Sequence, residues 1–126
     1  MSQTTAILNY FGRMHNLIPQ DPLIAFNGEC MSEHYWRDHF QNEILPALHS
    51  ENRAEAIKEA VPKFLPGFMQ KLEARLPADK KYLCGDELSI YDFSVGGYFT
   101  NIVCNPMTKD PEVWAAEWAK APQRVQ

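Results

Sequence analysis

The sequence lacks a long apolar run, a basic cluster and a leader-like N-terminus. No apolar stretch reaches the roughly 18 residues that a membrane-spanning helix requires, and no basic segment followed by an apolar one begins the chain. We therefore expect neither a membrane span nor a signal peptide. Lys and Arg total 12 against 16 Asp and Glu. The resulting net charge of −4 argues against nucleic acid and anionic membrane surfaces as partners.

Cysteines are few, and their spacing is not paired. The chain has three, Cys30, Cys84 and Cys104, and an odd number without paired spacing predicts reduced thiols in a cytoplasmic setting. His34 follows Cys30 by four residues, so both could face one metal from a helix. Zinc usually takes three or four protein ligands, and no second pair supports these two, so no metal site is predicted. Cys84 has no base nearby in the sequence, which predicts an unreactive thiol.

Apolar residues at helical spacing are abundant. The 126 residues fit one domain, and no segment alternates with period two for long enough to predict a sheet. Apolar steps of three and four predict about five helices. These cover approximately residues 5–15, 23–49, 50–76, 89–104 and 111–120. The expected fold class is all-α, a helical bundle.

Prolines and a serine mark the expected helix ends. Pro19 and Pro22 should end the first helix and open the second. Ser50 is the expected cap of the third helix. Pro62 and Pro66 lie inside that helix and predict a kink, because each removes a backbone donor and clashes with the preceding turn.

Glycines interrupt two of the predicted helices. Gly28 lies in the second helix, where a missing side chain often lets another backbone or a ligand approach. Gly96 and Gly97 lie in the most apolar helix, at a propensity cost of about 2 kcal/mol together. We expect this pair to allow close packing between helices rather than to cradle a phosphate, because no strand precedes it.

A capping segment opens that apolar helix. Ser89 and Asp92 are spaced as a variant of the capping box, in which each side chain bonds the backbone amide of the other residue. Leu88 before the cap and Phe93 after it are spaced to form a hydrophobic staple. A cap of this kind contributes about 1 kcal/mol.

The capping segment lies within a longer pattern. The run from Tyr82 to Phe93 reads YLCGDELSIYDF, and it resembles the segment that opens the central helix of the C-terminal domain in cytosolic glutathione transferases. That family segment has an aromatic and an aliphatic residue, Gly-Asp, an aliphatic residue, Ser or Thr, another aliphatic residue and Asp in this order. The run from Gln3 to Tyr10, QTTAILNY, is similar to the family's Gln-Ser-x-Ala-Ile-x-x-Tyr segment. The resemblance covers essentially the whole chain.

The resemblance implies a domain division. Family members join a thioredoxin-like domain, which holds the residue that activates the glutathione thiol, to an all-α domain. By this comparison residues 1–17 correspond to the last helix of the thioredoxin-like domain, and residues 18–126 to the helical domain without its final helix. The chain would then be a fragment that lacks the catalytic residue, and no catalytic residue is assigned to it.

The glutathione site is implied by the resemblance at two residues only. Gln3 and Thr4 match the family pair that holds the γ-glutamyl carboxylate at a helix N-terminus, which is a natural anion site. The other interpretation is that Thr4 or Thr5 simply caps the helix. Two residues cannot hold a tripeptide by themselves, so the capping interpretation is favoured for this chain alone.

The second predicted helix would supply the wall for the hydrophobic electrophile. Phe26, Cys30 and Met31 lie in the corresponding region, although ordinary core is the favoured interpretation of each residue taken alone. Asp38 lies near the position of an acid that, in some family members, reaches across the dimer to the glutathione amine. Arg37 aligns there equally well, and a solvated helix face is the competing interpretation for both.

Two functions are compatible with this resemblance. In the first, the parent protein is a cytoplasmic glutathione transferase, of a sigma-like class, that acts in detoxification as a homodimer with glutathione as co-substrate and no further cofactor. In the second, the chain is a non-catalytic interaction module like those in translation-factor and synthetase complexes. A thioredoxin-like segment upstream would favour the enzyme.

Overall fold

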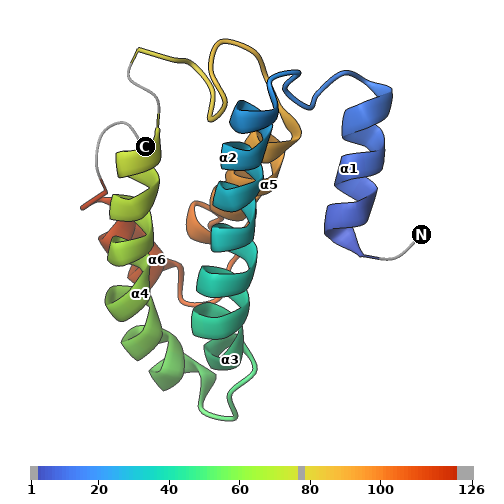
Figure 1. The fold of residues 1–126 in the computed structure, drawn as a ribbon. Coiled ribbons are helices and arrows are strands. Elements are labelled where there is room, and N and C mark those ends of the chain that lie inside the picture. Colours follow the sequence, from blue (N-terminus) through green and yellow to red (C-terminus); the bar gives the residue numbers. More distant parts are fainter. Residues whose placement is uncertain (1–2, 77–78, 122–126) are drawn as a thin grey trace.

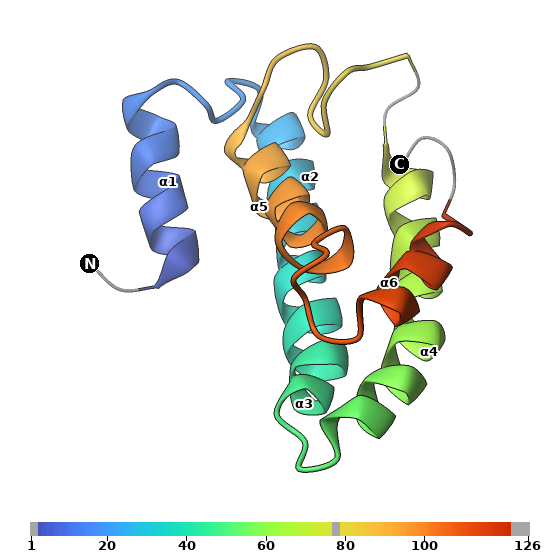
Figure 2. The same ribbon diagram turned by 180° about the vertical axis from the view of Figure 1, so that it is seen from behind.

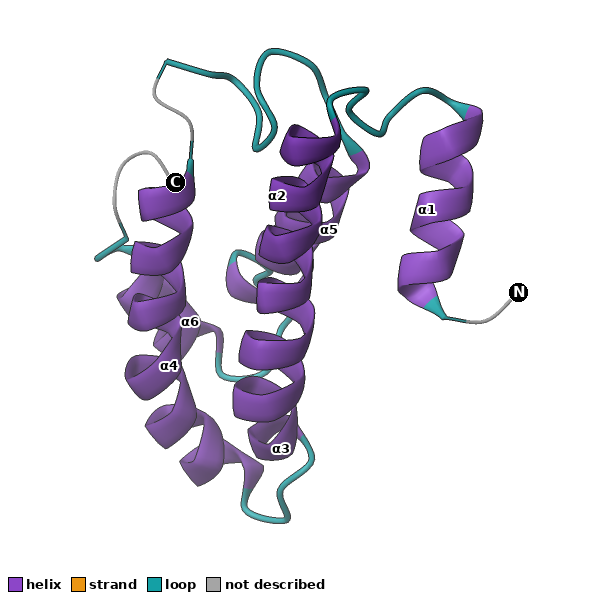
Figure 3. Ribbon diagram, in the orientation of Figure 1, coloured by secondary structure: helices purple, strands orange, loops and turns teal. Residues whose placement is uncertain are grey.

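The protein is a bundle of helices in a computed structural model, which describes residues 3–76 and 79–121 (Figure 1). The described residues contain no strand beyond an isolated bridge between Tyr82 and Gly85 (Figure 3). Within this part of the chain, no helix is long and apolar enough to cross a membrane. The all-α prediction is confirmed.

The first helix, α1 (Thr4–Met14), lies to one side of the bundle and contacts α5. Gly12 permits this contact, because a Cβ atom there would lie 2.5 Å from Ile90 Cγ2. The chain that follows α1 then closes the top of α5, where Leu17 O accepts a hydrogen bond from the Ile90 amide at 2.9 Å. This bond satisfies one of the amides that a helix N-terminus leaves without a partner.

The second predicted helix is continuous but not uniformly α-helical. It comprises α2 (Pro22–Glu33), the π-helical segment η1 (His34–Ile44) and α3 (Leu45–Leu48). Asp21 caps α2 by accepting from the Leu23 and Ile24 amides at 2.8 and 3.2 Å. π-Helical turns are rare and occur frequently at functional sites. The predicted extent of this helix is confirmed. The spacing of its apolar residues did not predict the π-helical geometry.

The third helix, α4 (Arg53–Arg75), runs back along η1. The prediction that Ser50 caps it is wrong, because residues 51–52 form a turn first and Asn52 occupies the N-cap position without a side-chain bond. Pro62 and Pro66 both lie inside α4 as predicted, and the ribbon changes direction along it (Figure 2). The helix ends at Arg75, and the C-cap residue Leu76 has an extended ψ of 127°, which fits a residue before proline.

The central helix comprises α5 (Ile90–Tyr98) and a second π-helical segment, η2 (Phe99–Val103). The last helix, α6 (Pro111–Trp118), packs against α4. Trp114 is fully buried. The core forms where η1, α4, α5 and α6 face one another. Its largest fully buried side chains include Trp114, Tyr98, Ile44, Ile57, Leu65 and Met69.

The predicted role of the glycine pair in α5 is wrong. No heavy atom from outside the local backbone would lie within 4 Å of a Cβ at Gly96, and at Gly97 only Asn101 Nδ2 would, at 3.9 Å. Their carbonyl groups instead accept side-chain hydrogen bonds, from Thr100 Oγ1 to Gly96 at 3.0 Å and from Asn101 Nδ2 to Gly97 at 2.7 Å. The pair therefore forms an open surface of the helix, and helix packing does not require glycine there.

Candidate functional site

The start of α5 is organised by the carboxylate of Asp92. Its Oδ2 accepts from the Ser89 amide at 2.8 Å and from the Ser89 hydroxyl at 2.7 Å, within the predicted capping box. Its Oδ1 accepts from the Leu83 amide at 2.8 Å. Ser89 is buried, so the cap lies where solvent cannot replace it. Asp92 therefore fixes both the helix and the loop before it.

The other two residues of the capping segment are exposed. Leu88 and Phe93 both leave a large part of their side chains in solvent. A staple between them would leave both side chains partly in solvent. The position of the helix start thus depends on the polar bonds of Asp92 and on the Leu17 carbonyl.

A cleft of about 600 Å³ lies between α2, the end of α4 and the loop that Asp92 holds. Its volume is in the range of small-molecule sites. Nine residues line it: Ile24, Asn27, Cys30, Met31, Arg75, Lys80, Leu83, Cys84 and Gly85. The cleft therefore combines an apolar surface, two thiols and two cations.

The cleft brings together two of the three predicted wall residues. Cys30 and Met31 line it, whereas Phe26 does not and is 60% exposed. Gly28 permits a close approach, as predicted, but the groups that approach are side chains of this chain and not a backbone or a ligand. A Cβ there would lie 2.3 Å from the Tyr91 ring and 2.6 Å from Cys84 Sγ, so side chains of this chain already fill that space.

The cleft residue Cys84 is not an activated thiol. Burial raises its pKa, and the nearby Asp92 charge raises it further, while a hydrogen bond with Ser89 acts in the opposite direction. Because the thiolate is the nucleophile, a raised pKa agrees with the unreactive thiol predicted for this position. Cys30, by contrast, is exposed at the cleft.

The predicted glutathione residues lie at the N-terminus of α1. Gln3 is the N-cap residue and Thr4 the first helical residue, with no side-chain capping bond. The interpretation of Thr4 or Thr5 as the cap is therefore wrong. Gln3 has φ 74° and ψ 102°, a strained conformation for a residue with a side chain, and such strain is concentrated at functional sites.

The structure does not bring this N-terminus and the cleft together. Both views of the ribbon show α1 on one side of α2 and α4 on the other (Figures 1 and 2). The cleft faces α4, whereas Gln3 and Thr4 lie beyond α2 on the α1 side.

Asp38 and Arg37, the alternatives for a cross-dimer contact, both lie on η1. Asp38 Oδ2 is 3.1 Å from His34 Nδ1, and Arg37 pairs with Glu33 Oε2 at 3.4 Å. The Asp38 and Arg37 side chains are largely exposed, as a solvated helix face requires. No group of three metal-ligating side chains is present among the described residues.

The sequence did not predict a buried polar cluster around His39. His39 is 1% exposed, and its Nδ1 and Nε2 lie 2.8 Å from Glu43 Oε2 and 2.9 Å from the Tyr98 hydroxyl. Its ring stacks on Phe68 with the centroids 4.4 Å apart. Burial lowers the pKa of His39, partly opposed by the hydrogen bond with Glu43, and burial raises the pKa of Tyr35 to about 12. The bond between His39 and the Tyr98 hydroxyl therefore joins η1 to α5 within the core.

The model of the family described as glutathione S-transferase, C-terminal domain, matches residues 35–115, nearly two thirds of the chain. The chain belongs to this family. The match begins at Tyr35 and includes His39, the Asp92 cap and Trp114. A search of curated proteins and a search of solved structures gave no significant match. The glutathione S-transferase match thus extends from η1 into α6. The helices α1 and α2 precede it, and so do all the predicted glutathione and electrophile residues except Asp38.

Proposed function

We propose that this chain is the helical part of a cytoplasmic, homodimeric glutathione transferase that conjugates the glutathione thiolate to apolar electrophiles in detoxification. Residues 1–17 then correspond to the last helix of a thioredoxin-like domain, and residues 18–126 to the helical domain. We assign no thiol-activating residue among these 126 residues, and we expect no conjugation from this chain alone. A sigma-like class is our working assignment.

The observation that supports this proposal most is the N-terminus of α1. The first helical hydrogen bond runs from the Ile7 amide to Gln3 O at 3.1 Å, so the amides of Thr4, Thr5 and Ala6 precede it. Unpaired amides and the helix dipole favour an anion. The strained Gln3 directs the chain into this helix, and the Thr4 hydroxyl adds a donor. Together they suit the γ-glutamyl carboxylate of glutathione.

The electrophile wall remains a prediction. The cleft unites Cys30 and Met31, but α2 separates it from Gln3 and Thr4. Phe26 is exposed and available to a substrate or to a neighbouring domain. We keep Asp38 as the proposed cross-dimer partner of the glutathione amine, because its carboxylate is largely exposed even though it lies 3.1 Å from Nδ1 of the mostly buried His34.

The test is a conjugation assay with glutathione and a chlorodinitrobenzene on the full natural gene product and on the 126-residue chain. We expect conjugation by the former and only the uncatalysed rate with the latter. In the active protein, T4V should raise the KM for glutathione by about tenfold with little change in kcat, as the loss of one charge-assisted hydrogen bond predicts. T5V, the matched control, should leave the KM unchanged. Equal effects of the two variants would contradict the assignment of Thr4.

The alternative function is a protein-interaction module, favoured by one feature of α1. Its residues Tyr10, Phe11 and Met14 all lie exposed, which is unusual for three large apolar side chains on one helix. A gene product that neither binds nor conjugates glutathione, and that forms a stoichiometric complex with another protein through α1, would favour this function over the transferase.

A further inference from the structure

Three side chains form a line of hydrogen bonds from the core to the surface. The Tyr98 hydroxyl lies 2.9 Å from His39 Nε2, and His39 Nδ1 lies 2.8 Å from Glu43 Oε2. A carboxylate only accepts, so Nδ1 carries the imidazole hydrogen and Nε2 accepts from the Tyr98 hydroxyl. Tyr98 and His39 are buried, whereas Glu43 is partly exposed. The phenol of Tyr98 therefore has a base beside it in the core, and a carboxylate at the surface supports that base.

The Tyr98 hydroxyl does not lose its proton by simple ionisation. Burial raises the pKa of Tyr98 well above its ordinary value, and burial lowers the pKa of the neutral His39 imidazole. Transfer of the proton alone would leave a phenolate and an imidazolium in the core, where desolvation opposes both charges. If Tyr98 loses an electron at the same time, its phenoxyl group is neutral. The one new charge is then the imidazolium, which Glu43 stabilises.

Aromatic rings connect Tyr98 to the surface. The ring centroids of Tyr98 and Tyr35 lie 5.1 Å apart, and those of Tyr35 and the half-buried Trp36 lie 6.1 Å apart. A second route runs from Trp36 to Phe40 at 5.3 Å and from Phe40 to Tyr98 at 5.9 Å. Rings in contact allow an electron to pass between them. In the described part of the chain, no hydrogen bond gives the Tyr35 hydroxyl a base, so the oxidised state is held at Tyr98.

We propose that Tyr98 is a redox-active tyrosine, which loses one electron by way of Trp36 while its proton moves to His39. A one-electron oxidant at the surface takes an electron from the Trp36 ring and is reduced. An electron from Tyr98 restores Trp36, the Tyr98 O–H bond breaks, and the proton forms an N–H bond at His39 Nε2. The products are the reduced oxidant, a neutral phenoxyl radical and an imidazolium paired with Glu43. None of the residues assigned to glutathione or to the electrophile takes part, so this proposal can fail or succeed independently of the conjugation.

Flash oxidation of the 126-residue chain tests the proposal, with photogenerated ruthenium(III) tris(bipyridine) as the one-electron oxidant. The parent chain carries Y10F, which removes an exposed tyrosine. Electron paramagnetic resonance at neutral pH should detect a tyrosyl radical, and Y98F should abolish it. Y91F is the matched control, because Tyr91 is also buried on α5 but has no hydrogen-bonded histidine in the described part of the chain. This variant should keep the radical signal.

Two further variants test the base and the path of the electron. H39Q should lose the radical, because an amide does not take up the proton, whereas H49Q, which alters an exposed histidine, should keep it. W36F should slow the formation of the radical, because phenylalanine is harder to oxidise than tryptophan. If Y98F does not fold, H39Q and W36F decide the matter. The absence of a tyrosyl radical in the parent chain, its persistence in Y98F or H39Q, an unchanged rate in W36F, or its loss in Y91F would overturn the proposal.

Discussion

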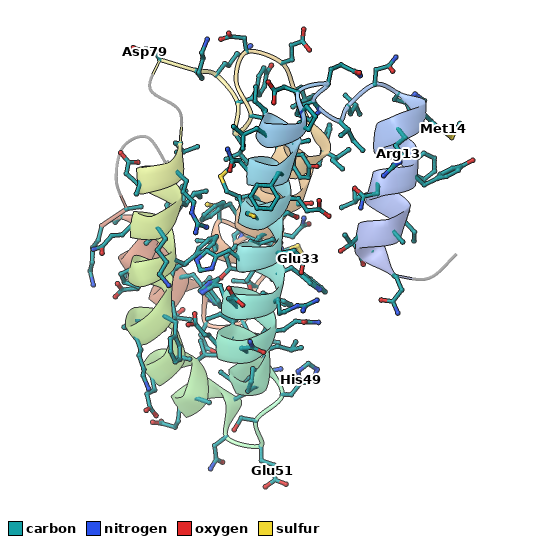
Figure 4. The ribbon with its side chains drawn as sticks, viewed as in Figure 1. Arg13, Met14, Glu33, His49, Glu51 and Asp79 are labelled. Carbon is teal, nitrogen blue, oxygen red and sulfur yellow. The ribbon has the colours of Figure 1, made fainter. Side chains whose placement is uncertain are left out.

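The helices α1 and α5 contact each other, yet they differ in how much of their apolar surface the molecule covers. In α5 the buried residues are Ile90, Tyr91, Val95 and Tyr98, whereas in α1 only Gly12 is buried. Met14 lies on the side of α1 that faces away from the bundle (Figure 4). An apolar stripe predicts a helix in both cases, but it does not identify the surface that covers the stripe.

The largest expected effect contrasts the same substitution in the two helices. Tyr98 is 1% exposed and bonds His39, whereas Tyr10 is 49% exposed. Y98A should lower the free energy of unfolding by about 3–5 kcal/mol, as for other large aromatic core residues, and Y10A by less than about 1 kcal/mol. Urea denaturation measures both. Similar losses would mean that α1 is as integral to the bundle as α5.

The second contrast concerns helix caps. Asp92 accepts three hydrogen bonds at a buried helix start, whereas Asp21 accepts two at an exposed one. D92A should cost about 3 kcal/mol because it leaves buried donors unpaired, and D21A about 1 kcal/mol. Thermal unfolding should separate the two melting temperatures by several degrees. An unchanged melting temperature in D92A would refute the role assigned to this cap.

The third contrast is between glycines. G12A places a Cβ 2.5 Å from Ile90 and should weaken the docking of α1, whereas a Cβ at Gly96 meets open space. G96A should therefore raise the free energy of unfolding by about 1 kcal/mol through helix propensity. Chemical denaturation measures G96A, and proteolysis of α1 measures G12A. A destabilised G96A would show that this glycine has a packing role after all.

The smallest expected effect is a pH dependence from His39. Burial lowers its pKa below the ordinary value of 6.5, so between the two values the unfolded chain binds a proton that the folded chain does not. Stability is then complete above about pH 6.5 and declines as the pH falls below it. Around this site lie Glu43, His34, Lys71 and the Tyr98 hydroxyl.

Two glutamine variants isolate the contribution of His39 to the pH dependence of stability. H39Q should lose part of the decline in melting temperature between about pH 7.5 and pH 5.5, whereas H49Q, which alters an exposed histidine bonded to Leu45 O, should retain it. If the two variants follow the same pH profile, the decline has another origin.

Several elements were predictable from the sequence because their causes are local. The apolar stripes predicted the helices, and the spacing of Ser89 and Asp92 predicted the cap. The His39–Tyr98 bond joins residues 59 positions apart, so only its local half, the i,i+4 spacing of His39 and Glu43, was visible. The cleft forms because Arg75 and Lys80 lie near α2 in the fold. No spacing in the sequence predicts this proximity. The packing role of Gly96 and the kind of group that approaches Gly28 depend on neighbours from other elements, and for that reason neither was predicted correctly.

Native-state hydrogen exchange is the most direct measurement of the difference between α1 and the bundle. Amides that open only by global unfolding exchange at the free energy of the whole domain, whereas locally opening segments exchange at lower values. We predict that the slowest amides of η1, α4 and α5 share the global value and that those of α1 exchange substantially faster. Equal protection of α1 and α5 would contradict this account, because α1 would then be part of the same cooperative unit.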